Sequence, residues 1–255
     1  MKGPNNAARR IITTVLGLAL MMVLVSACRS APPYQGLEAD AVFEMAVQAF
    51  EDEEWGDARD ALEHFLTTYA GHGQAAEARM LLARTYYNRE EYLSAADEFQ
   101  RFLQLHPSHG LAPEASLGIC RSYVQLAPHP QRDQEYTERA RNACRTTSNE
   151  FEGMNVAEEA DELRARMTNR LAEREYQIGR FYQRRNAHDS AILIFQDLVD
   201  FYPESDWAPR GFLALYRSYR AIRWNEEAEE VRDRLLFLYP DSDAAQELRA
   251  EDDGS

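Results

Sequence analysis

The sequence predicts an all-α fold: a superhelix (solenoid) of about five helix-turn-helix units of the tetratricopeptide (TPR) type, with an elongated helix in the fourth unit. Turn segments recur at an offset of 37 residues, since 68–73 aligns with 105–110 and 201–205 aligns with 238–242. A small residue stands twelve positions before each turn, and no stretch alternates polar and apolar residues for long enough to indicate a sheet. A fixed period of this kind is typical of repeat proteins, in which each unit packs against its neighbours.

The small residues indicate two helices in each unit, because helices approach closely where both carry small side chains. The small position of the second helix is held by Ala58, Ala95, Ala140, Ala191 and Ala228. The small position of the first helix is held by Ala46, Ala83, Cys120 and Gly179. The fifth unit has Tyr216 there, which suits a terminal unit with no successor to pack against. Large apolar residues continue the second-helix face four or seven positions later, namely Leu62, Phe65, Phe99, Phe102, Phe195, Leu198 and Leu235.

Two insertions interrupt this pattern. About eight extra residues around 127–133 separate the two helices of the third unit, and about fourteen lengthen the fourth unit. Because 156–185 contains no proline and one glycine, we expect its first helix to run about thirty residues, or ~45 Å. The second helix of the third unit, 137–151, is unusually polar for a buried element.

The N-terminal segment predicts export and lipidation. Lys2, Arg9 and Arg10 precede an apolar run over 11–25, which is too short for a permanent membrane span and suits a secretory signal. The run ends in Val-Ser-Ala-Cys at 25–28, the lipobox of bacterial lipoproteins, although an ordinary signal peptide with a chance cysteine is the alternative. We therefore expect a signal peptide over 1–27, acylation of Cys28, and a flexible tether over 28–37. Arg29, in place of Asp, favours transfer to the outer membrane under the sorting rule of enteric bacteria.

Charge and motif content exclude several classes of function. The formal net charge is −15, and removal of the three cations of the signal peptide takes it to −18, so nucleic-acid binding is disfavoured. The sequence contains no phosphate loop, nucleophile elbow or zinc motif, and we expect no enzyme activity, no cofactor and no metal. Cys120 and Cys144 are expected as two buried free thiols about one turn out of opposition, with a disulfide as the alternative that an oxidising periplasm allows.

The lipobox, the five units, the mature length and the long helix of the fourth unit together resemble the BamD family of outer-membrane assembly factors. The stretch from 170–176 through 181–185 is similar to that family's segment joining a long helix to a shorter partner. The resemblance implies a lipid-anchored scaffold of the β-barrel assembly machinery on the periplasmic face of the outer membrane. Units one and two, 38–110, would bind C-terminal peptides of unfolded outer-membrane proteins. Units three to five, 111–247, would dock the barrel-forming subunit and its accessory lipoproteins, and 248–255 would be an acidic tail.

The residue after each first-helix small position is expected to face the concave groove of the solenoid, and in four units it is an arginine. A guanidinium binds a carboxylate bidentately, so this arginine ladder suits carboxylate-bearing partners. The predicted peptide-binding groove consists of Phe43, Val47, Phe50, Met80, Arg84, Tyr87, Leu117, Arg121 and Val124. The predicted partner-docking residues are Arg180, Arg184 and Arg217. The alternatives are that the arginines pair with neighbouring glutamates and that neighbouring helices cover the apolar residues.

Two other classes of function compete with the assembly scaffold. One is a different TPR lipoprotein, such as a pilus-secretin pilotin or a cell-wall coordinating factor, for which a more regular array is expected. The other is an enzyme, which would need a catalytic cluster that the sequence does not contain.

Overall fold

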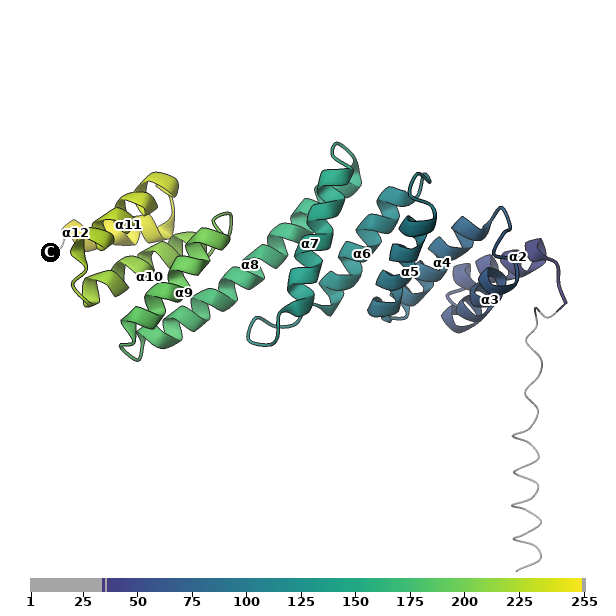
Figure 1. Ribbon diagram of the computed structural model, residues 1–255, viewed down its shortest axis with the longest axis horizontal. Coiled ribbons are helices and arrows are strands. Elements are labelled where there is room, and N and C mark those ends of the chain that lie inside the picture. The colour runs from purple at the N-terminus through teal and green to yellow at the C-terminus, as the bar shows by residue number, and fades with distance from the viewer. Residues whose placement is uncertain (1–33, 35, 254–255) are drawn as a thin grey trace, which may run out of the picture.

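The computed structural model describes residues 34 and 36–253, and in this part of the chain the regular secondary structure is all helical, with no strand. Successive antiparallel helices stack side by side into an elongated array (Figure 1), which confirms the predicted TPR solenoid. The helices are α2 (Ala39–Glu51), α3 (Trp55–Thr68), α4 (Ala75–Asn88), α5 (Tyr92–Leu105), α6 (Ala112–Leu126), α7 (Glu135–Glu150), α8 (Asn155–Gln183), α9 (His188–Phe201), α10 (Ala208–Ala221), α11 (Asn225–Leu238) and α12 (Asp243–Asp253). None of these described helices is long and apolar enough to cross a membrane.

The small positions lie where the helices of a unit touch. Ala46, Ala83 and Cys120 are fully buried, as are the second-helix alanines opposite them. The glycine position is the tightest of its kind: at Gly179 in α8 a Cβ atom would lie 2.4 Å from the ring of Phe195. No side chain fits at that distance, so the phenylalanine of α9 packs directly on the backbone of α8. The repeat pattern in the sequence therefore records the contacts between paired helices.

The turn between the two helices of a unit has the same backbone conformation in four of the five units. One residue in each turn has a positive φ of 58–65°, and these residues are Glu53, Glu90, Asn186 and Arg223. Within each pair of neighbouring units they are 37 residues apart, as the period requires. The third unit has no residue of this kind in its hairpin, because the insertion over 127–134 connects α6 to α7 instead.

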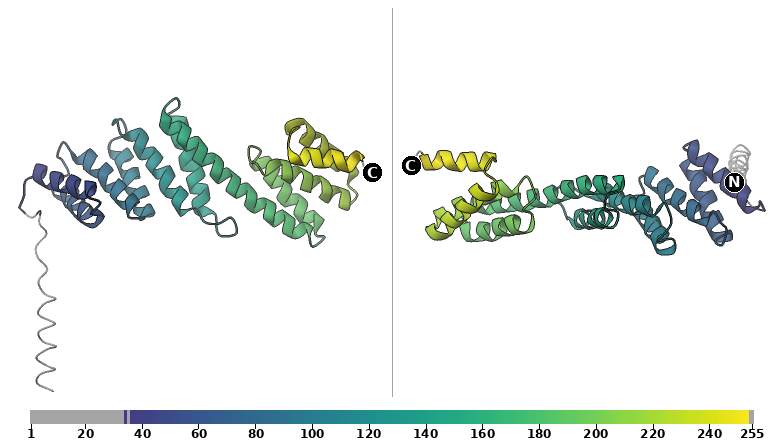
Figure 2. Two further views of the ribbon diagram at one scale, coloured as in Figure 1. Left: turned by 180° about the vertical axis from the view of Figure 1, so that it is seen from behind. Right: turned by 90° about the horizontal axis from the view of Figure 1, so that it is seen from above.

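The long helix α8 joins the two halves of the molecule. It has 29 residues, close to the predicted thirty, and it contacts α6 and α7 at one end and α9 and α10 at the other. Figure 2 shows it running diagonally between the two groups of shorter helices. The positions of the N-terminal and C-terminal units are therefore coupled through one continuous helix.

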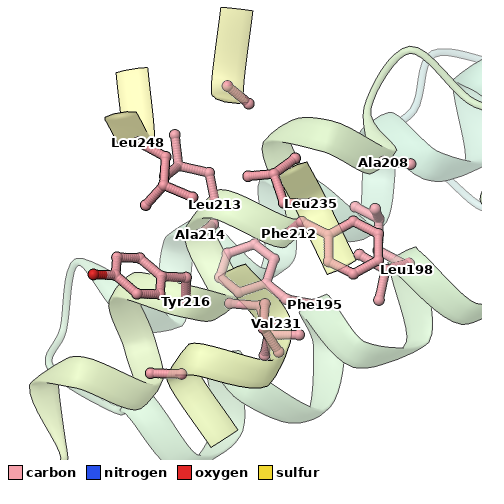
Figure 3. Packing of buried hydrophobic residues seen from close by; sticks show 14 of the residues in the cluster. Phe195, Leu198, Ala208, Phe212, Leu213, Ala214, Tyr216, Val231, Leu235 and Leu248 are labelled. Atoms are coloured by element: carbon pink, nitrogen blue, oxygen red, sulfur yellow. The ribbon is translucent and has the colours of Figure 1, made fainter. Parts of the chain in front are cut away.

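The C-terminal end of the described chain differs from the sequence-based expectation. Residues 248–253, predicted to belong to an acidic tail, are part of α12, which packs against α10. Leu248 is fully buried beside Leu213 in the large C-terminal core (Figure 3). Tyr216 was interpreted as the mark of a unit without a successor, and this interpretation is wrong, because α12 covers α10 and Tyr216 is only 8 % exposed.

The prediction of two free thiols is also wrong, since Cys120 of α6 and Cys144 of α7 form a disulfide. Their Cα atoms are 4.7 Å apart, inside the range of about 7 Å that a disulfide requires. The two positions lie opposite each other because the seam between α6 and α7 is lined by small side chains, including Ser116, Ala140 and Thr147, all buried. This lets the helices approach more closely than a seam filled with phenylalanine would.

Candidate peptide groove and cationic faces

Three of the four ladder arginines bind a glutamate two helices later in the chain. Arg84 of α4 donates to Glu114 of α6 through Nε and Nη2, at 3.1 and 2.7 Å. Arg121 of α6 binds both carboxylate oxygens of Glu159 of α8, at 2.7 and 2.6 Å. Arg217 of α10 likewise donates to Glu247 and Glu251 of α12. The alternative interpretation of the ladder, pairing with neighbouring glutamates, therefore holds for these three arginines.

Arg180 is the exception. Its Nη1 donates to the side-chain oxygen of Gln183 in the next turn of α8, at 2.7 Å. Gln183 in turn donates to the backbone oxygen of Ala214 and to the hydroxyl of Ser218, so the amide is anchored to α10. The guanidinium of Arg180 is thus held in place by a neutral group.

The ion pairs are partly open to water. The hydrogen bond from Arg121 holds the pKa of the Glu159 carboxyl below its ordinary value, and the same hydrogen bond raises the pKa of Arg121. Both side chains of this pair are about 40 % exposed, at 42 % and 40 %. An ion pair this exposed stabilises a fold by about 0–1 kcal/mol, so a carboxylate from another molecule can replace the glutamate at little cost.

A hollow lies on the N-terminal half where these pairs begin. It has a volume of about 250 Å³ and is lined by Phe50, Arg84, Tyr87, Asn88, Phe99, Glu114, Gly118 and Arg121. Four of the nine predicted groove residues therefore meet in one place. Among the lining residues that the prediction missed, Glu114 had a signal in the sequence, since it stands in the first turn of its helix, 30 residues after Arg84. We call this region the N-terminal hollow.

The other five predicted groove residues do not line this hollow. Met80 and Leu117 are 1 % and 3 % exposed and belong to the hydrophobic core, so their placement on the groove wall was wrong. Phe43 packs against Phe65 with ring centroids 5.5 Å apart. Val47 and Val124 are half-buried. The physical reason is that a helix inside a stack has neighbours on two sides, which narrows the face left open to solvent.

A second, larger hollow lies beside α8. Its volume is about 970 Å³, and it is lined by Pro130, Gln131, Arg132, Asp133, Arg174, Tyr176, Gln177, Ile178, Arg180, Phe181, Tyr182 and Arg184. It contains two of the three predicted docking residues, Arg180 and Arg184. The third, Arg217, does not line it and is paired with α12. We call this region the α8 hollow.

The turn histidines are structural. His72 and His109, 37 residues apart, each accept a backbone N–H two residues later and each pack edge-on against a phenylalanine, Phe65 and Phe102 respectively. In the described part of the chain no group of three or more His, Cys, Asp or Glu side chains is arranged to hold a metal ion. The predicted lipidation site, Cys28, lies outside the described residues.

Of the three solved structures described next, two are TPR proteins by name. The TPR2AB domain of yeast Sti1, solved as a pHSP90 complex, is 12% identical, with a TM-score of 0.39 and coverage of 81% of this chain and 80% of that one. A thermophilic TPR protein of Thermus thermophilus is 17% identical, with a TM-score of 0.35 and coverage of 84% and 98%. The MamA protein of Desulfovibrio magneticus is 16% identical, with a TM-score of 0.36 and coverage of 82% and 98%. At these scores the TPR assignment depends on the helix hairpins described above.

The comparison with curated proteins gave no match. The family model described as "YfiO: Outer membrane lipoprotein" matches residues 36–235, which is most of the chain and includes the long helix α8 and both hollows. This agrees with the resemblance that the lipobox, the unit count and the long helix indicated. The chain belongs to the YfiO (BamD) outer membrane lipoprotein family.

Proposed function

We propose that this protein is a non-enzymatic scaffold of the outer-membrane β-barrel assembly machinery, anchored by its lipid to the outer membrane and facing the periplasm. Its N-terminal units bind C-terminal segments of unfolded outer-membrane proteins, and its C-terminal units dock the barrel-forming subunit and accessory lipoproteins. The observation that carries the proposal is the family match over 36–235, combined with two open hollows at different places along the solenoid. A solenoid binds through extended surfaces, which fits a role in positioning partners.

The chemistry of the N-terminal hollow supports a terminal carboxylate as its ligand. Arg84 and Arg121 line the hollow together with the rings of Phe50 and Tyr87, so cations and aromatic groups are close to one another. A peptide that ends in an apolar residue with a free carboxylate matches both, because its carboxylate can bind the arginines and its apolar side chain can pack on the rings. The incoming carboxylate exchanges with Glu114 or Glu159, whose ion pairs with the two arginines are weak because they are exposed to water.

The peptide test compares two forms of one ligand. We expect a peptide with a free C-terminus to bind more tightly than its amidated form, and the Arg84→Ala/Arg121→Ala double variant to lose this preference. Charge pairs this open to water contribute about 0–1 kcal/mol each, so removal of both arginines should lower the affinity several-fold, up to about thirtyfold. Added salt should weaken the wild-type complex, because charges open to water are screened over roughly 8–10 Å. If amidation does not change wild-type affinity, the terminal-carboxylate proposal is wrong.

The partner test is affinity purification from solubilised outer membrane. Co-isolation of the barrel-forming subunit supports the assembly scaffold. Co-isolation of a pilus secretin in its place would assign the protein to the competing class of TPR lipoproteins and would contradict the proposal.

The anchor test uses Cys28→Ala. Each buried CH₂ of an acyl chain contributes about 0.8 kcal/mol to membrane binding, so several chains on one residue give stable anchoring. We expect the variant to lose palmitate labelling and to appear as a soluble or unprocessed form. Labelling that persists in Cys28→Ala would contradict acylation at this residue.

A further inference from the structure

One arginine of the ladder, Arg180, differs from the other three because it is bound to a glutamine and not to a glutamate. The helices α6 and α10 both start with Ala-Pro, and the third residue differs: the sequences are Ala-Pro-Glu at 112–114 and Ala-Pro-Arg at 208–210. In α6 the third residue is Glu114, and it pairs with Arg84 of α4. In α10 the same place holds Arg210, which carries the wrong charge to pair with Arg180 of α8. Within residues 36–253 the chain thus supplies a carboxylate to the arginines at 84, 121 and 217 but not to Arg180.

Arg180 lies in the α8 hollow, where further cations gather. Arg132, Arg174 and Arg184 line the same hollow. Arg174 pairs with Glu175, whereas no ion pair joins Arg132 or Arg184 to a carboxylate within residues 36–253. Asp133 is the acidic residue of the lining, and its side chain accepts the backbone N–H of Glu135 at the start of α7. In a chain with a net charge of −15, this hollow is therefore locally cationic.

The walls of the hollow are held by specific hydrogen bonds. Arg170 of α8 donates to the backbone oxygens of Ala127 and Pro128, at 2.7 and 3.1 Å, and so ties the connection after α6 to α8. The buried amide of Gln134 donates to the backbone oxygens of His129 and Arg132, at 2.9 Å each. In Figure 1 this connection is the loop below α7, beside the middle of α8. The insertion of the third unit is therefore a fixed wall that presents Arg132.

The position of Arg180 and Arg184 near the end of α8 gives them one ordinary role, since cations stabilise the C-terminus of a helix by about 0.3–1 kcal/mol. That role does not explain Arg132, which lies in the connection, or Arg210, which stands in the first turn of α10. Exposed Phe181 adds an apolar surface, with Arg185 stacked on its ring at 3.6 Å. The hollow thus offers guanidinium groups beside an aromatic ring.

We propose that the α8 hollow binds an acidic segment of a partner polypeptide, whose glutamate or aspartate supplies to Arg180 the carboxylate that α10 lacks. The proposal rests on the docking role proposed for the C-terminal units, and it identifies the place and the ligand chemistry. A carboxylate is favoured as the ligand because the chain itself binds the equivalent arginines with carboxylates. Arg132 and Arg184 bind further acidic side chains of the same segment, and Phe181 contacts an apolar one.

The first experiment uses a synthetic peptide with several glutamates and one tyrosine, acetylated and amidated so that it has no terminal carboxylate. Fluorescence anisotropy measures its binding to the full chain, with the same peptide carrying glutamine in place of glutamate as the reference. We expect the glutamate peptide alone to bind, and Arg180→Gln/Arg184→Gln to weaken it by about tenfold or more. The control Arg101→Gln/Arg145→Gln removes the same charge from exposed positions on α5 and α7 and should bind like the wild type. Equal binding of the two peptides, or no loss in the Arg180/Arg184 variant, overturns the proposal.

The second experiment tests the interrupted pairing directly. With Arg210→Glu, α10 would begin with Ala-Pro-Glu as α6 does, and Arg180 would gain an intramolecular carboxylate. This variant should therefore weaken peptide binding more than Arg210→Gln does. Equal affinities of these two variants would overturn the pairing argument. Vesicles containing phosphatidylglycerol test the other anionic source: sedimentation with vesicles that depends on Arg180 and Arg184, without peptide binding, would assign the hollow to lipid phosphate and refute the proposal. Because the peptide lacks a free C-terminus, these results are independent of the client-binding test at the N-terminal hollow.

Discussion

In the second unit phenylalanines of α5 fill the core between α5 and its neighbours α4 and α6, whereas in the third unit a disulfide and a hydrogen bond close the seam between α6 and α7. Phe99 and Phe102 stand four and seven residues after Ala95 and are 4 % and 0 % exposed. At the same two positions after Ala140 stand Cys144, bonded to Cys120, and Thr147. The hydroxyl of Thr147 lies 2.8 Å from that of buried Ser116.

The two units show that one hairpin geometry can be built from different interactions. An aromatic side chain buries about 150–250 Å² and stabilises by the hydrophobic effect, which does not depend on the redox state. A disulfide stabilises mainly by restricting the unfolded chain, and it is present only in an oxidising compartment. The third unit also contacts α8, the helix that joins the two halves of the molecule, so its integrity affects the position of both hollows.

The largest expected effect is in the second unit. Phe102→Ala should lower the free energy of unfolding by about 3–5 kcal/mol, because a fully buried ring is removed and leaves a cavity. Equilibrium denaturation under oxidising and reducing conditions should give the same loss. A loss that appears only after reduction would contradict the comparison.

The next effect is in the third unit. Reduction, or replacement of Cys120 and Cys144 by alanine, should cost about 2–4 kcal/mol, because the bridge closes a loop with a sequence separation of 24 residues. Hydrogen exchange should accelerate first in α6 and α7. If exchange accelerates uniformly along the whole solenoid, the third unit does not depend on the disulfide more than the other units do. The double alanine variant should be insensitive to reductant, which serves as the control.

A smaller effect is expected from the buried hydroxyl pair. Thr147→Val keeps the shape of the side chain and leaves the hydroxyl of Ser116 without its partner in α7, so the free energy of unfolding should fall by about 1 kcal/mol. Combining it with Ser116→Ala should recover part of the loss, since no unpaired hydroxyl remains. A double variant as unstable as the sum of the single variants would show that the two hydroxyls act independently.

The smallest effect has the opposite sign. Glu90, in the turn of the second unit, has a φ of 62°, which costs a non-glycine residue about 1 kcal/mol. Glu90→Gly should therefore stabilise by roughly half a kcal/mol after the entropy of glycine is subtracted. Arg132→Gly in the connection of the third unit is the control and should not stabilise, because no residue of that connection has a positive φ. Thermal unfolding of both variants measures the difference.

Much of the candidate site was predictable because it follows the repeat. The register of the ladder arginines and the N-terminal cluster of Phe50, Arg84, Tyr87 and Arg121 follow from a fixed period and the geometry of a helix. The long helix α8 was predictable from the absence of proline over 156–185. The α8 hollow was only partly predicted. Arg180 and Arg184 were identified, but Arg132 comes from an insertion whose course along α8 depends on hydrogen bonds from Arg170, which no repeat pattern encodes.

The sequence by itself determined the all-α fold, the number of hairpins up to 247 and the place of the insertions, because small and aromatic residues at a period of 37 define which helix faces meet. Only the tertiary structure decided which of those faces remain open. The burial of Met80 and Leu117 and the cover that α12 provides for α10 depend on a second neighbour in the stack. The Cys120–Cys144 bond depends on the distance between two helices, which is set by every side chain along their seam and not by the spacing of two cysteines.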